Sequence, residues 1–167
     1  MRHYLLAALL LSGAALAQSP PPAGPPPKPA RGPSLAAALD LAQGAIAACA
    51  AKGYAISVTI ADSAGNAKVT LAADNSGGRT STSLRKAATA AIFKASGAAI
   101  AEREKTDPAL AAKIAAGPTL YSDHAGSLPL YAGSEVIGGI GIAGSPSHEQ
   151  DAACAKAAID RYGKELK

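Results

Sequence analysis

Two pairs of short alternating segments, each joined by a turn, limit the folds open to this chain of 167 residues more than any other feature. Large and small side chains alternate over residues 54–61, turn-forming residues follow at 62–66, and an alternating run resumes at 67–73. Residues 128–131 and 136–142 make a second pair. Strands joined by short turns pair antiparallel, whereas parallel strands need long crossovers. The sequence therefore predicts two β-hairpins and favours an antiparallel sheet over a doubly wound parallel one.

A helix is predicted before the first hairpin. Ser34 is of the residue type that caps helix N-termini, and Gly53 is of the type that ends helices. Apolar residues between them recur at spacings of three and four, which places them on one helical face. The face that we expect to be buried comprises Leu35, Leu39, Ala42, Ile46 and Cys49.

More helices are predicted between and after the hairpins. One runs over about 81–96, a second helical stretch follows Gly97, and the segment 107–117 opens with the Asp-Pro pair typical of a helix start. Ser147 with Gln150 is a capping box for a last helix. The expected buried stripe of the helix at 81–96 comprises Leu84, Ala88, Ala91 and Ala95.

The resulting order of elements is α-β-β-α-α-β-β-α. Because both strand pairs are locally connected, this order predicts an α+β fold, a small antiparallel β-sheet flanked by helices. Alanine is abundant in the predicted helices, and its small side chain permits close packing on the sheet. We therefore expect a core with few large side chains.

The first 17 residues have the features of a signal peptide. Arg2 gives a positive start, residues 5–11 are an unbroken apolar run, and Ala15-Leu16-Ala17 is a cleavage-site pattern, so residues 1–17 are expected to be removed. A membrane anchor is the alternative, but the apolar run is far shorter than the ~20 residues that a spanning helix needs. The sequence predicts a periplasmic or secreted protein with no membrane span.

Residues 18–33 are predicted to form a spacer before a single domain at 34–167. The spacer holds eight of the twelve prolines and no large apolar side chain. Such a composition is typical of an extended polyproline II segment. The alternative is a docking site for a proline-recognition domain.

The net charge of +4 lies mostly outside the predicted domain. Arg2, Lys28 and Arg31 precede it, which leaves 13 basic and 12 acidic residues at 34–167. A nearly neutral domain gives no support for binding to nucleic acid or anionic lipid. One Phe, five Tyr and no Trp also argue against a stacking platform for single-stranded nucleic acid.

Cys49 and Cys154 are the two cysteines, and they fall on the first and last predicted helices. An even number of cysteines in an exported chain favours a disulfide, here closing a loop of ~100 residues. The alternative is two buried thiols. No CxxC spacing indicates a catalytic cysteine.

His124 and His148 are the candidate metal ligands. They are the only histidines after the predicted cleavage site, and either imidazole can ligate haem iron, as can the phenolate of Tyr121 or Tyr131. Neither histidine has a second His or Cys at ligand spacing, so a closed zinc site is not supported. The alternative is that both histidines are solvated.

Arg85, Lys86 and Thr89 lie near the start of the helix predicted at 81–96. Their cations and hydroxyl can bind the carboxylates or propionates of a ligand. The alternative is a solvated helix face.

Residues 139–144 match the dinucleotide-binding pattern G-x-G-x-x-G. That pattern needs a βαβ unit of ~30 residues and an acidic residue after its second strand. The chain ends at Lys167, within or just after the following helix, so no nucleotide site is expected. We interpret the glycines as positions where another backbone or a ligand approaches closely. No nucleophile, base and acid set appears, so no catalytic residue is predicted.

Three stretches carry a resemblance to a known family. They are VTIADSAG at 58–65, RKAATA at 85–90, and LPL at 128–130 with VIGGIGIAG at 136–144 and Gln150-Asp151. With them the chain, from Leu35 to about Ala158, resembles the haem-degrading, HbpS-like or GlcG-like domain that also forms the C-terminus of PduO proteins.

The resemblance implies an antiparallel sheet with helices, homo-oligomers and, in some members, haem or corrinoid binding. We therefore expect an exported small-ligand binding protein for haem or a related tetrapyrrole, with His124 or His148 as axial ligand. The alternatives are a non-catalytic oligomeric accessory protein for an exported partner and a weak haem-modifying redox protein; enzymatic activity is not favoured. The predicted ligand-binding residues are Arg85, Lys86, Thr89 and, from the 126–129 loop, Gly126 and Pro129.

Overall fold

The structure, a computed structural model, describes residues 29–166. The predicted signal peptide and most of the predicted spacer lie outside the described residues. Four strands form one antiparallel sheet in the order β2-β1-β4-β3. The two predicted hairpins are confirmed, and β2 and β3 are the edge strands. The strands are β1 (Ser57–Asp62), β2 (Ala67–Ala72), β3 (Ser127–Ala132) and β4 (Glu135–Ala143).

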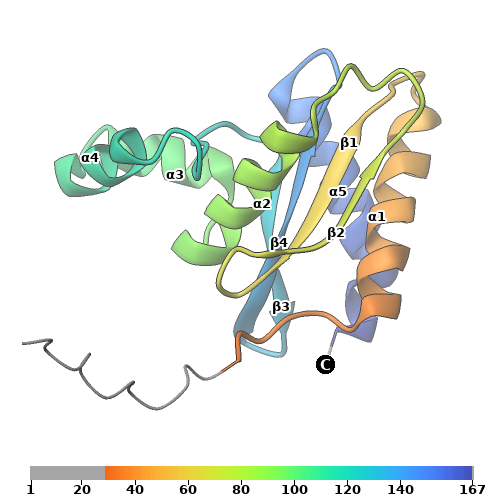
Figure 1. Ribbon diagram of the computed structural model, residues 1–167, viewed down its shortest axis with the longest axis horizontal. Helices are drawn as coiled ribbons and strands as arrows, with labels where there is room; N and C mark the ends of the chain where they lie inside the picture. The colour runs from red at the N-terminus through yellow and green to blue at the C-terminus, as the bar shows by residue number, and fades with distance from the viewer. Residues whose placement is uncertain (1–28, 167) are drawn as a thin grey trace, which may run out of the picture.

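Helices cover both faces of this sheet (Figure 1). Helices α1 (Leu35–Ala50) and α5 (His148–Tyr162) pack together on one face, and α2 (Thr80–Phe93) covers the other. Helices α3 (Gly97–Glu104) and α4 (Pro108–Ala116) extend beyond α2, and a short 3-10 helix, η1 (Gly163–Glu165), follows α5. This arrangement confirms the predicted α+β class and alternation of elements, with α2, α3 and α4 between the hairpins.

The main core lies between the sheet and the pair α1 and α5. Its large side chains come mostly from the strands, whereas the helices contribute mainly alanines. Among the described residues, no helix is long and apolar enough to cross a membrane. The fully buried strand and helix residues include Leu41, Val58, Ile60, Leu130, Ile137, Ile140 and Ile142.

The predicted buried face of α1 is partly wrong. Leu35 is 59 % exposed, whereas Leu41, which lies outside the predicted face, is fully buried. In an alanine-rich helix several stripes satisfy the same periodicity, and packing against α5 and the sheet selects among them. The helix begins after the Ser34 cap as predicted, but it ends at Ala50, and Gly53 (φ +79°) lies in the turn beyond it.

The glycines of β4 allow α2 to lie directly on the sheet. A Cβ at Gly139 would collide with the Ala87 carbonyl, and one at Gly141 would collide with the backbone of Ser83 and Ala87. The interpretation of residues 139–144 as a place of close backbone approach is confirmed. This contact fixes the height of α2 above the sheet, and with it the position of Lys86.

The predicted disulfide between Cys49 and Cys154 is present. It joins α1 to α5 with a Cα–Cα distance of 5.5 Å, and both cysteines are fully buried. The bridge therefore holds the first turns of α5, which carry site residues, against α1.

Candidate functional site

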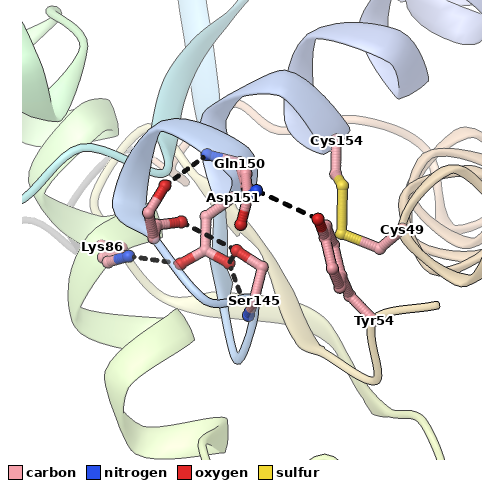
Figure 2. The surroundings of a disulfide bond; sticks show 8 residues. Cys49, Tyr54, Lys86, Ser145, Gln150, Asp151 and Cys154 are labelled. Atoms are coloured by element: carbon pink, nitrogen blue, oxygen red, sulfur yellow. Dashed lines mark hydrogen bonds and ion pairs between the residues drawn. A yellow bond between two sulfur atoms is a disulfide. The ribbon is translucent and has the colours of Figure 1, made fainter. Parts of the chain in front are cut away.

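A buried ion pair lies at one end of the sheet, between α2 and the first turn of α5 (Figure 2). The Lys86 Nζ donates to Asp151 Oδ2 at 2.9 Å and to the Ile142 carbonyl at 2.9 Å. The two side chains are 1 % and 3 % exposed. Burial lowers the pKa of Lys86, and the Asp151 carboxylate opposes this effect.

Asp151 also holds the loop that precedes α5. Its Oδ1 accepts from the backbone N–H of Ser145 at 3.1 Å and from the Ser145 hydroxyl at 2.6 Å. Gly126 (φ +104°) covers the pair from the other side, where a Cβ would approach Lys86 Nζ and Asp151 Cβ to 2.6 and 2.7 Å. The structure therefore brings the predicted site residues Lys86 and Gly126 together.

A cavity of about 440 Å³ lies beside this ion pair. The loop between β4 and α5 forms one wall, and residues around the start of α2 form another. Lys86 contributes only a small part of the wall, because its amine is occupied by the partners described above. The polar residues lining the cavity include Arg79, Thr82, Ser145, Ser147, His148 and Glu149.

The two predicted metal ligands are neighbours. His124, in the loop after α4, and His148, the first residue of α5, have ring centroids 4.7 Å apart, and both are exposed. They line a shallow depression of about 290 Å³ together with the small side chains of Ala98, Ala101 and Ala125. Tertiary packing alone creates this proximity, because 23 residues separate the two in the sequence.

The hydrogen-bond partners of the two histidines differ. His124 Nδ1 is 2.8 Å from Asp123 Oδ1, and an imidazole that donates Nδ1–H to a carboxylate keeps its Nε2 lone pair for a metal. His148 Nδ1 instead lies 3.3 Å from Lys86 Nζ, a donor that favours the tautomer protonated at Nε2. Burial lowers the pKa of His148, with a further contribution from the Lys86 charge. His124 is thus the better placed ligand for iron.

Arg85 and Thr89 flank the loop that carries His124. Arg85 Nη1 donates to the Pro118 carbonyl at 2.7 Å, and Arg85 and His124 line one depression of about 280 Å³. Thr89 is fully buried; its hydroxyl donates to the Arg85 carbonyl and accepts from the Ser122 N–H at 2.8 Å. The Thr89 hydroxyl therefore positions the loop that carries His124, and its role toward a ligand stays a prediction.

Pro129 lies apart from these residues. It is in strand β3, not in a loop, and lines a groove between β3 and α5. Lys86 is buried, so it does not belong to a solvated helix face; its role as a cation for a ligand stays a prediction. Asp151 was not among the predicted site residues, although Gln150-Asp151 is part of the family motif; its partner Lys86 lies 65 residues earlier, so no local pattern reveals the pair.

Within residues 29–166, no group of three or more His, Cys, Asp or Glu side chains is arranged to hold a metal ion. His124 and Arg85 line the same depression, so an imidazole and a guanidinium cation lie on one surface.

Comparisons with known proteins agree with the fold. The family model described as "Haem degrading protein HbpS-like" matches residues 34–160. A crystal structure of HbpS is 30 % identical, with a TM-score of 0.72, over 83 % of this chain and 95 % of that one. The crystal structure of a PduOC:heme complex is 25 % identical, with a TM-score of 0.67, over 76 % and 92 % of the two chains.

Another structure supports the fold alone. Klebsiella pneumoniae protein ORFY is 23 % identical, with a TM-score of 0.74, over 87 % of this chain and 99 % of that one. The search of curated proteins found no match.

Proposed function

The chain belongs to the HbpS-like family, and from this premise we propose that it binds haem, or a closely related tetrapyrrole, on the surface around His124. The observation that carries the proposal is the contact of 2.8 Å between His124 Nδ1 and Asp123 Oδ1, which orients the ring and makes Nε2 the atom that would bind a metal. A related solved structure is a heme complex, which supports the choice of ligand.

Three depressions adjoin on this surface and give it room for a ligand larger than any one of them. Thr82 lines the first and third, His148 and Glu149 line the first and second, and Asp123 and His124 line the second and third. Three alanines line one of them beside three carboxylate side chains, and Ile114 and Tyr121 add apolar area to another. When bound, haem supplies an iron that accepts an axial imidazole. The chain would supply that imidazole, apolar contact area, and the Arg85 cation for a propionate.

Haemin titration followed at the Soret band tests this proposal. His124→Ala should weaken binding strongly and change the Soret position, whereas His148→Ala should retain a wild-type Soret position. Arg85→Ala should weaken binding without changing the Soret position, since it removes a propionate contact and no iron ligand. No saturable change with the wild-type protein would exclude the proposal, and equal effects of the two histidine variants would exclude His124 as the selected ligand.

We also propose that the chain is exported and cleaved after Ala17. The buried disulfide supports this, because disulfides persist in oxidising compartments. The intact mass of the protein recovered from the periplasm or the culture medium should correspond to residues 18–167 with one disulfide. A mass that includes Met1 would contradict export with cleavage.

Homo-oligomerisation, which the family resemblance implies, stays a prediction. Light scattering during size-exclusion chromatography of residues 18–167 measures it directly. A mass equal to one chain over a wide concentration range would contradict it.

A further inference from the structure

An apolar groove runs along the free edge of the sheet, outside the surface proposed for haem. Strand β3 forms one wall, α5 with the residues after it forms the other, and Ala95, Ser96 and Ala99 line part of the groove as well. Pro129, Tyr131 and Ile159 line both of its adjoining parts, which measure about 440 and 360 Å³. Tyr131 is 47 % exposed although it is a large aromatic residue. We name this surface the β3–α5 groove (Leu128, Pro129, Tyr131, Ile159 and Leu166).

The start of the described chain lies at one end of this groove. The Ser63 N–H donates to the Arg31 carbonyl at 2.8 Å, and the Arg31 side chain forms an ion pair with Glu135. Glu135 pairs with Ala132 across the β3–β4 hairpin, one residue from Tyr131. In Figure 1 the chain before α1 crosses below the sheet and leaves near the end of β3. The residues before Arg31 therefore begin beside the groove.

The residues before Arg31 are rich in proline, a composition typical of segments that bind in apolar grooves with aromatic side chains. Residues 19–28 include six prolines, and Lys28 is their only charged side chain. Polyproline II segments dock in grooves lined by aromatic side chains, and they offer carbonyl acceptors but few N–H donors. Tyr131 supplies an aromatic ring and a hydroxyl donor, while Pro129 and Ile159 supply apolar contacts.

The lengths also match. Ten residues in polyproline II conformation span about 31 Å. The six residues of β3 span about 20 Å, so the segment is long enough to follow the whole strand. A short tether keeps such a segment at a local concentration of about 1 mM or more near the groove, which favours a weak contact within one chain over the same contact between chains.

We propose that residues 19–28 occupy the β3–α5 groove of their own chain. The proline-rich segment then covers apolar surface on the sheet edge instead of serving only as a spacer. The exposed Arg31–Glu135 pair directs the segment toward the groove and contributes little binding energy itself. This proposal does not depend on haem binding.

The absence of Trp from the chain permits a direct test. Tyr131→Trp places a single fluorophore in the groove of residues 18–167, and a second protein carries the same change with the six prolines of 19–28 replaced by serine. With the native segment, we expect bluer Trp emission and a smaller acrylamide quenching constant, both unchanged on dilution. Leu120→Trp is the matched control, because Leu120 is 60 % exposed and lies outside the groove; serine replacement should leave its quenching unchanged.

Two outcomes would overturn the proposal. Equal quenching of the Tyr131→Trp protein with both segments would show that the prolines do not cover the groove. Protection that disappears on dilution would show that a second copy of the chain occupies it. Hydrogen exchange of β3 in the protein with Tyr131 intact provides a check independent of the Trp substitution, since native prolines should slow exchange at 130–132 relative to the serine segment.

Discussion

Lys86 of α2 and Asp151 of α5 form an ion pair of 2.9 Å that crosses the end of the sheet and is almost fully buried. Because α2 and α5 cover opposite faces, this pair connects the two helical layers next to the candidate site. Because both side chains are buried, bulk water cannot solvate the remaining charge when one of the two is removed. The pair therefore ties the stability of the fold to the geometry of the loop at 144–147.

Lys86→Met is predicted to lower the free energy of unfolding by about 3–5 kcal/mol, because it leaves the Asp151 carboxylate buried without its cation. Urea denaturation followed by circular dichroism measures the change. The control is Lys156→Met, which breaks the exposed pair with Asp160 and should cost about 0–1 kcal/mol. Equal costs for the two variants would contradict the role given to burial.

Removal of the Cys49–Cys154 disulfide, by changing both residues to Ala, is predicted to destabilise the protein by about 2–5 kcal/mol, because the bridge restricts a long loop in the unfolded chain. The two cysteines are 105 residues apart. Thermal unfolding compares the variant with the oxidised wild type. The control is wild-type protein that was unfolded, reduced and kept in reductant, and its melting temperature should be close to that of the variant. A melting temperature that this treatment leaves unchanged would contradict the bridge.

Gly141→Ala is predicted to cost about 1–3 kcal/mol or more, since the new methyl group would press on the backbone of α2, which cannot move as a side chain can. Gly163→Ala is a matched control: its φ of −63° suits alanine, and its nearest contact is the Ile159 side chain. Urea denaturation of both variants gives the comparison. If Gly141→Ala lowered the free energy of unfolding no more than the control, the close approach of α2 to the sheet at Gly141 would be contradicted.

Features set by neighbouring residues were predicted well from the sequence. Ser34, Asp107 and Ser147 each cap a helix in the structure, because a capping side chain bonds to an N–H only a few residues away. The hairpins follow for the same reason, since each turn fixes the pairing of its two flanking strands.

Apart from the Cys49–Cys154 disulfide, which the even number of cysteines indicated, the features set by distant contacts could not be predicted. Lys86 is surrounded in the sequence by residues that also suit a solvated helix face, and only the packing of α5 against its amine shows why it is buried. The proximity of His124 and His148 depends in the same way on how α5 meets the loop after α4. Leu35 is the opposite case: its hydrophobicity predicts burial, but no other part of the described fold covers its side chain, which is exposed.

The stability of the protein should depend on His148 at mildly acidic pH. Burial and, after it, the nearby positive charge of Lys86 lower its pKa below the usual value of about 6.5. Between that lowered pKa and about 6.5, the unfolded chain binds the proton more readily than the folded one. Stability therefore rises with pH through this window and is lost as the pH falls through it.

His148→Asn is predicted to remove this contribution. The melting temperature of the wild type should fall between pH 7.5 and 5.5 by more than that of the variant, because asparagine takes up no proton there. Differential scanning fluorimetry at several pH values in this range measures both curves, and the restricted range keeps ordinary carboxylates ionised. A variant that loses as much stability on acidification as the wild type would show that the Lys86–His148 contact does not oppose protonation.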